Sequence, residues 1–271
     1  ARPQDAQRHS LDEMQPPLSE LVGSWADHLA EGPVGPAIII DLSPRLSDAQ
    51  REEVGDILGA RWQDSPITWE WVSKGQGRID RLTVWFGGAA DAHSPARMLR
   101  LLTDGSVVRF AGESITATTD VPSTPQHGQW LTIVDSALLS SGLQQQWLRK
   151  AISHHSPSRW LRTDGRRPLL LTDIPLRMDD PKVSSFVSTT GEIMSQAKLP
   201  PNEAGIESIL VSARSAYLAR LTLRCSLSPE LQPILQQAID KRLKTHPRGK
   251  QGFLINADTP NGPGWFICRA P

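Results

Sequence analysis

Residues 37–69 read AIIIDLSPRLSDAQREEVGDILGARWQDSPITW, and this stretch decides which fold class the sequence indicates. It opens with an apolar run that ends in Asp41, which is typical of a buried strand. A helical stripe of apolar residues follows, with Ser47 at the position of an N-cap. Ser65-Pro66 then marks the junction to a second strand, because proline disfavours helical geometry in the residue before it. The stretch therefore predicts a β–α–β unit.

The same order of features returns at residues 129–160. An apolar run ends in Asp135, a helical pattern covers 140–153, and a second Ser-Pro-x-x-Trp motif ends at Trp160 as the first ends at Trp69. We interpret the motif as the mark of an internal duplication, since Ser-Pro suits a helix-to-strand junction without any ligand. The predicted fold is α/β, with a mixed α+β arrangement as the alternative. It has two similar β-α-β-containing subdomains and three-layer packing.

The predicted domains follow from composition. Residues 1–17 are polar and indicate a flexible N-terminal lead-in. The first α/β subdomain is expected at 18–122 and the second at 129–271, separated by the Pro- and Ser-containing linker at 120–128.

The remaining patterns predict the smaller elements. Two strands joined by a turn are expected within 64–88, and a hairpin within 252–270. Helices are expected over 94–105, 182–199 and 228–247, and β character over 205–226.

Composition and charge exclude several classes. The 29 basic residues balance the 29 acidic ones, so no overall field attracts nucleic acid or an anionic membrane. No apolar run approaches the roughly 20 residues that span a bilayer. The sequence does not decide the compartment: a periplasmic or membrane-anchored soluble domain and a cytoplasmic protein both stay open, since a signal or anchor could have been removed before Ala1. Cys225 and Cys268 form no metal pattern and are expected as buried free thiols, with a disulfide as the alternative in an oxidising compartment.

The sequence lacks the common catalytic signatures, namely the P-loop and the motifs GxGxxG, CxxC, HExxH and GxSxG. The best case for an enzyme is a set of aspartates that end apolar strands, Asp41, Asp135 and Asp173, with His154 assisting. Carboxylates gathered at strand ends could hold a divalent cation for hydrolysis. The same residues are ordinary turn and N-cap residues, so this metal-dependent hydrolase is the alternative function. No cofactor or metal is expected in the favoured reading.

The favoured function is a non-catalytic protein-binding or adaptor module, a soluble domain of a bacterial secretion or envelope protein. The nine tryptophans suggest the interface, because tryptophan is enriched at binding hot spots. The candidate binding residues are Trp69, Trp71, Trp85 and Trp160. The expected partner is another protein, whose identity and stoichiometry the sequence does not give, and nucleic acid is not expected to bind.

Overall fold

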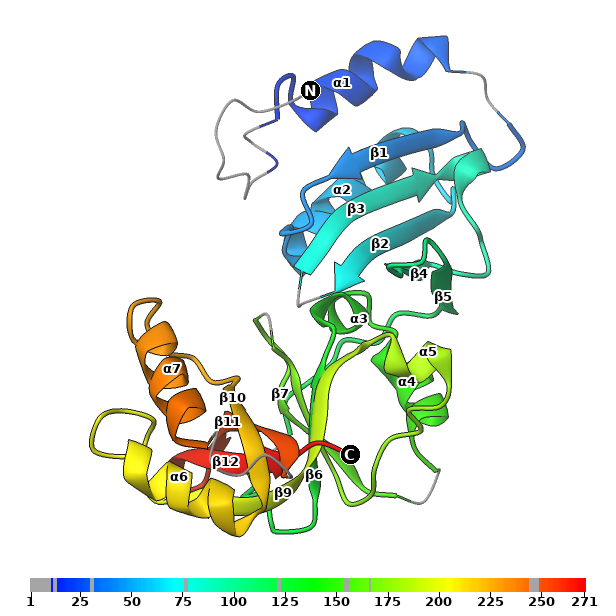
Figure 1. Cartoon of the computed structure of the whole chain (residues 1–271). Coiled ribbons are helices and arrows are strands. Elements are labelled where there is room, and N and C mark those ends of the chain that lie inside the picture. Colours follow the sequence, from blue (N-terminus) through cyan, green and yellow to red (C-terminus); the bar gives the residue numbers. More distant parts are fainter. Residues whose placement is uncertain are drawn as a thin grey trace. The chain divides into compact units, whose positions relative to one another are not determined.

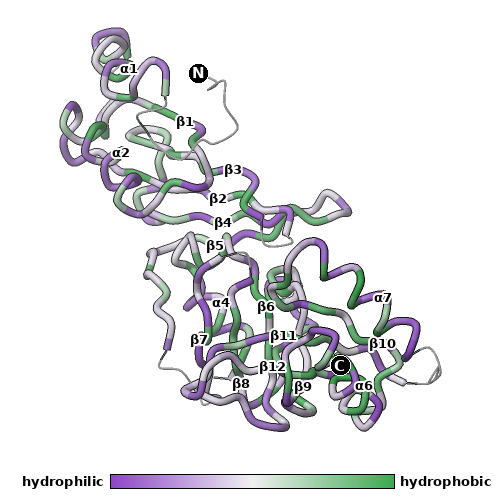
Figure 2. Tube along the Cα trace, turned by 90° about the vertical axis from the view of Figure 1, so that its left-hand side faces the viewer, coloured by the Kyte–Doolittle hydropathy of each residue, from purple (hydrophilic) through white to green (hydrophobic). Residues whose placement is uncertain are grey.

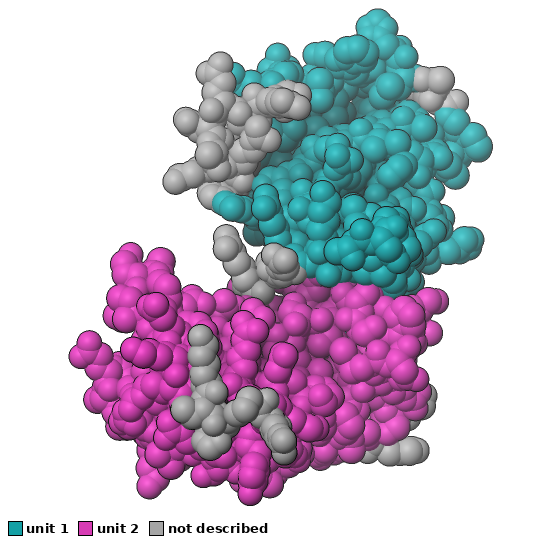
Figure 3. Space-filling model, in the orientation of Figure 1, with its two compact units in different colours: residues 1–116, 137–147 teal, residues 117–136, 148–271 magenta. Residues whose placement is uncertain are grey.

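The fold is mixed α/β, as expected, and its α-helices and strands form two compact units (Figures 1 and 3). The structure is a computed structural model that describes residues 11, 14–29, 32–75, 78–120, 123–153, 156–165, 167–243 and 249–271. Unit 1 comprises residues 1–116 and 137–147, and unit 2 comprises residues 117–136 and 148–271. Most of the predicted lead-in at 1–17 lies outside the described residues.

Unit 1 is built on a five-stranded sheet with the order β1-β3-β2-β4-β5. Strands β1 and β2 both run antiparallel to β3, which lies between them; β2 pairs in parallel with β4, and β4 pairs antiparallel with β5. The strands are β1 (Ile38–Leu42), β2 (Ile67–Gly75), β3 (Arg78–Phe86), β4 (Ala96–Leu101) and β5 (Val107–Gly112). The helical segments before β5 are α1 (Leu18–Trp25), η2 (Ala26–His28), α2 (Asp48–Arg61) and η3 (Gly87–Ala89).

One face of the unit 1 sheet packs against α2. Val54 and Leu58 of α2 are buried. The ring of Trp62, the C-cap residue of this helix, lies 6.0 Å from the ring of Phe86. The guanidinium of Arg51 lies 5.4 Å from the ring of Trp71. The other face is more polar, and hydrophilic and hydrophobic residues alternate along these strands (Figure 2). Accordingly β1 is not the doubly buried strand that was expected, since Ile39 on this second face is 56% exposed.

Unit 2 is built on a seven-stranded sheet with the order β10-β11-β12-β9-β6-β8-β7. Its only parallel pair is β10 with β11; the other neighbours are antiparallel. The strands are β6 (Trp130–Val134), β7 (Ser158–Arg162), β8 (Leu169–Thr172), β9 (Val187–Ala197), β10 (Leu218–Leu223), β11 (Lys250–Thr259) and β12 (Gly262–Arg269). The later helices are α3 (Ser136–Ser140), α4 (Gln144–Ala151), α5 (Pro181–Ser184), α6 (Ile206–Ser215) and α7 (Leu231–Leu243).

Helices α6 and α7 cover one face of the β10 end of this sheet (Figure 1). Their inward residues join the strands in one apolar cluster, to which Leu210 of α6, Leu221 of β10 and Ile239 of α7 belong. A second cluster, around Leu131, Phe253 and other strand residues, forms a separate core in the same sheet. Each cluster supplies the apolar burial that holds its part of unit 2 together.

Three predicted elements are wrong. Residues 94–105 contain β4 and not a helix, because Ala96 and Met98 are buried on one face while Arg97 and Leu99 alternate with them. Residues 182–199 form only the short α5 before the long strand β9. The third error is the reverse: residues 206–215 were expected to have β character but form helix α6.

The two segments that carry Ser-Pro-x-x-Trp have the same local topology. In the order β1-β3-β2 and in the order β6-β8-β7, the last strand along the chain lies antiparallel between the other two. Trp69 and Trp160 are each the third residue of their strand. The surroundings differ, since β2 also pairs in parallel with β4 whereas β6 pairs antiparallel with β9. The internal duplication is therefore not established, and it stays a prediction, as does the three-layer packing.

Within the described part of the chain, no helix combines the length and apolar character needed to cross a membrane. Cys225 and Cys268 are both buried and both free thiols.

Candidate functional site

A row of polar side chains crosses four strands of unit 1. Backbone pairing places Asp41 of β1 beside Thr83 of β3, Thr83 beside Glu70 of β2, and Glu70 beside Arg97 of β4. Directly paired residues point to the same face of a sheet, and successive residues point to opposite faces. These four residues, the polar row, therefore share the face opposite Trp71 and α2.

The buried end of the polar row is an ion pair. The Nε atom of Arg97 lies 2.6 Å from Oε2 of Glu70, and the two side chains are only 16% and 11% exposed. The guanidinium also lies 4.9 Å from the ring of Trp85, on the same face. The Nε1 atom of Trp85 is buried without a hydrogen-bond partner among the described residues. Charge, stacking and burial thus hold Arg97 in one place.

The open end of the polar row is Asp41. Thr83, which is 3% exposed, donates a hydrogen bond of 2.7 Å from its hydroxyl to Oδ1 of Asp41. Oδ2 of the same carboxylate lies 3.8 Å from Arg81, and the Asp41 side chain is 59% exposed. A buried hydroxyl therefore fixes a carboxylate that still reaches solvent, which is the arrangement needed to accept a hydrogen bond from a ligand.

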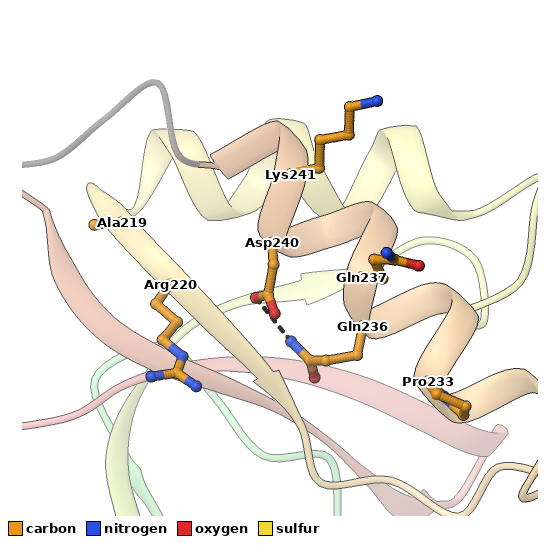
Figure 4. Close-up of a pocket in the computed structure, with 7 residues that line it drawn as sticks. All are labelled: Ala219, Arg220, Pro233, Gln236, Gln237, Asp240 and Lys241. Carbon is orange, nitrogen blue, oxygen red and sulfur yellow. Dashed lines mark hydrogen bonds between the residues drawn. The ribbon is translucent and has the colours of Figure 1, made fainter.

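A second candidate site is a groove in unit 2, where α7 lies beside the edge strand β10. It has a volume of about 790 Å³ and is lined by Ala219, Arg220, Pro233, Gln236, Gln237, Asp240 and Lys241 (Figure 4). In the close-up, Arg220 and Asp240 lie on opposite sides of the β10 ribbon, and Lys241 points away from the strand (Figure 4). We call this site the edge groove.

Gln236 closes part of the edge of β10 with its own amide. The Leu223 N–H donates to Oε1 of Gln236 over 2.8 Å, and Nε2 of Gln236 donates to the Leu221 carbonyl over 2.9 Å. The N–H and C=O of one residue in a neighbouring parallel strand would make the same two bonds. Nε2 also donates to Oδ1 of Asp240 over 3.0 Å, so the glutamine orients that carboxylate as well.

The strand-end aspartates do not form one cluster. Strands β6 and β8 are antiparallel, so Asp135 and Asp173, which follow them, lie at opposite ends of the pair. Asp135 is buried, and Asp173 accepts a hydrogen bond from Gln129. Asp41 belongs to the other unit, and His154 lies outside the described residues. Across the described ranges, no three His, Cys, Asp or Glu side chains are grouped so that they could hold a metal ion.

The four candidate tryptophans do not form one exposed surface. Trp71 and Trp160 are buried, at 2% and 5% exposure, so they serve as core residues. Trp69 is half-buried, with its ring 6.5 Å from that of Trp71, and the half-buried Trp85 lies beneath Arg97.

Sequence reasoning missed most of both candidate sites. For the polar row a signal was present: Glu70 stands between Trp69 and Trp71, and a glutamate inside an apolar strand needs a partner. The edge groove had no such signal, because Arg220, Gln236 and Asp240 are ordinary surface residue types whose meaning depends on the strand edge between them.

Comparisons with known proteins show that this chain resembles a solved structure in its fold. No family model matches the chain, and no curated protein matches its sequence. Among solved structures, a chain described as a "putative methyltransferase" from Porphyromonas gingivalis W83 matches with a TM-score of 0.56 and 15% sequence identity. The match covers 99% of this chain but 58% of the Porphyromonas chain, so this chain spans little more than half of that protein.

This likeness corrects the function expected from the sequence. The fold of the whole chain resembles that of a protein described as an enzyme, and that overturns the expectation of a non-catalytic adaptor from a secretion system. The error came from treating absent motifs as an absent activity. A chain that spans 58% of a similar protein can lack a cofactor motif and still share the fold of that protein.

Proposed function

We propose that this chain is part of a methyl-transferring enzyme, and that it supplies structure beside the methyl donor rather than the donor's own binding site. The observation that carries the proposal is the match over 99% of this chain to 58% of the Porphyromonas protein. At 15% identity the likeness concerns the fold, so methyl transfer is our inference from it.

The place in unit 1 where a methyl donor would be expected to bind does not fit it. S-adenosylmethionine contains an adenosine group, and open α/β sheets bind ligands in the crevice at the carboxyl ends of their parallel strands, beside the start of the next helix. In unit 1 that place is the β1–α2 junction. There the Ser47 hydroxyl accepts from the Gln50 N–H, and the Gln50 side chain accepts from the Ser47 N–H. This capping box already satisfies two N–H donors that a ligand at this junction would use.

Asp41 is the residue of unit 1 that best suits a role toward substrate. Transfer of a methyl group to nitrogen or oxygen needs the nucleophile to be oriented and its proton to be accepted. Asp41 offers a solvent-reaching carboxylate whose Oδ1 is fixed by Thr83. We propose that it accepts a hydrogen bond from the nucleophile of the substrate.

The first test measures the donor. The protein, at the length at which its source organism makes it, is titrated with S-adenosylmethionine by calorimetry and assayed for transfer of an isotope-labelled methyl group to protein, RNA and small-molecule fractions of extract. The 271-residue chain is titrated in parallel. Binding and transfer by the natural-length protein, with no binding by the 271-residue chain, are the expected results. Absence of donor binding in the natural-length protein refutes methyl transfer, and micromolar binding by the 271-residue chain refutes the placement of the donor site.

The second test addresses Asp41 in the same assay. Asp41→Asn should lower the transfer rate by about 10- to 100-fold, because the amide is a poor proton acceptor. Asp56→Asn, on the exposed surface of α2, is the matched control and should leave the rate unchanged. Equal rates for the two variants remove Asp41 from the proposal.

A further inference from the structure

The edge groove of unit 2 lies along an open strand edge. Strand β10 is the first in the sheet order, and only its inner edge pairs with β11. On the outer edge the Leu221 carbonyl and the Leu223 N–H face a side chain, Gln236, instead of another strand. Natural proteins often protect such edges, and here the Gln236 amide occupies the two edge groups that one residue of an added strand would use.

Charged side chains flank this edge on both faces of the sheet. Leu221 and Leu223 point toward α7 and its apolar cluster, so Arg220, which alternates with Leu221, points to the opposite face. Asp240 lies on the α7 side, where Gln236 orients it. Among the described residues Arg220 has no hydrogen-bond or ion-pair partner, and Asp240 has Gln236 alone. Protecting the strand edge requires only Gln236, so it does not explain why Arg220 and Asp240 lie here without ion-pair partners among the described residues.

We propose that the edge groove binds an extended peptide segment of another protein, which adds to β10 as an eighth strand and displaces Gln236. Added strands of this kind bind through main-chain hydrogen bonds and select alternate side chains on the two faces. The residue facing Arg220 should be acidic, and the neighbouring residue, which points toward α7 and Asp240, should be basic. The partner therefore carries adjacent acidic and basic residues in an extended segment. The proposal does not depend on methyl transfer.

The test uses a blocked, fluorescein-labelled heptapeptide of alternating threonine and valine with an adjacent Glu-Lys pair at its centre, titrated into the full chain by fluorescence anisotropy. Gln236→Ala should bind it about 5- to 100-fold more tightly than the wild type, because the removed amide makes two hydrogen bonds to β10 that the peptide otherwise has to displace. Gln236→Glu provides a second variant, since its carboxylate cannot donate to the Leu221 carbonyl. Ile234→Ala, at an exposed position of α7 outside the lining of the groove, is the control and should bind as the wild type does.

Charge and main-chain controls make the test specific. Arg220→Glu combined with Asp240→Lys should reverse the preference between the peptide and its Lys-Glu swapped form. A peptide with N-methyl groups on its edge-facing amides should not bind. Failure of both Gln236 variants to bind, or equal binding of the N-methylated peptide, overturns the proposal. Dimerisation of Gln236→Ala without peptide, seen by light scattering, also overturns it and assigns the edge to a second copy of the chain.

Discussion

At the scale of single residues, removing one charge of the pair Glu70 and Arg97 should destabilise the fold more than removing both. Both side chains are largely buried, and within the described part of the chain each is the other's only ion-pair partner. We expect Arg97→Met to lower the free energy of unfolding by about 3–5 kcal/mol, because it leaves Glu70 buried without a countercharge. The double variant Glu70→Met with Arg97→Met should recover most of that loss.

Urea unfolding followed by circular dichroism measures both effects. The exposed pair of Arg61 with Asp27 is the control, since Arg61→Met should change the free energy of unfolding by less than about 1 kcal/mol. If the double variant is no more stable than Arg97→Met alone, the buried charge is not the cause of the loss.

The buried thiol of Cys225 should make the protein less stable at high pH. Burial raises the pKa of the Cys225 thiol from 9.0 to about 11. The folded state therefore favours the protonated thiol, a contribution that is fully present below about pH 9 and is lost as the pH rises toward 11. The loss should be on the order of 2 kcal/mol. Unfolding free energies at pH 8 and pH 10.5 measure it, and Cys225→Ala should show a smaller fall between these two conditions; an equal fall in both proteins would contradict the assignment.

At the scale of elements, α2 contains two glycines that its packing does not require. A Cβ atom added at Gly55 or at Gly59 would have no neighbour within 4 Å. Gly55→Ala and Gly59→Ala should each raise the free energy of unfolding by about 0.5–1 kcal/mol, because alanine loses less backbone entropy in a helix. In the same helix Ser47→Ala should lower it by about 1 kcal/mol by removing the cap, and Ser47→Asp should not. Chemical denaturation compares the four variants, and destabilisation by either alanine at a glycine position would show an unrecognised contact.

The same helix explains which elements the sequence predicted well. Ser47, its partner Gln50 and the stripe through Val54 and Leu58 act locally, so the start and period of α2 could be read directly. Strands β4 and β9 were mistaken for helices because their short alternating patterns compete with helical spacing, and pairing with β2 and β6 decides the outcome. Pairing across the sheet is not visible in a local window of sequence.

At the scale of the whole molecule, strand order assembles the polar row. Residues 41, 83, 70 and 97 become neighbours only because β3 lies between β1 and β2. The sequence predicted the strands that carry Asp41, Glu70 and Thr83, but it predicted a helix for the segment of Arg97 and did not predict that β3 lies between β1 and β2. Asp41 was therefore grouped with Asp135 and Asp173 instead of with Thr83. The polar row could not be predicted from the sequence, because it is assembled by pairing between strands that are distant along the chain.

Strand order in unit 2 also sets an expected order of hydrogen exchange. Strands β9 and β12 are paired on both edges, whereas β7 lies at the end of the sheet. We expect backbone amides of β9 and β12 to exchange more slowly with deuterium than those of β7, because they open only when much of the sheet opens. Residue-resolved exchange by NMR or mass spectrometry measures this, and faster exchange in β9 than in β7 would contradict the strand order.

The place of β12 has a consequence for how the protein is made. Strand β12 is synthesised last of the seven strands, yet it lies between β11 and β9. While the ribosome is still translating the segments before Gly262, one edge of β9 has no strand to pair with. A nascent chain in this condition exposes an edge that other chains can pair with, so chaperone binding during translation should concentrate on β9. Shortening the protein before Gly262 would leave that exposed edge permanently, and the product should aggregate rather than fold into a smaller version of unit 2.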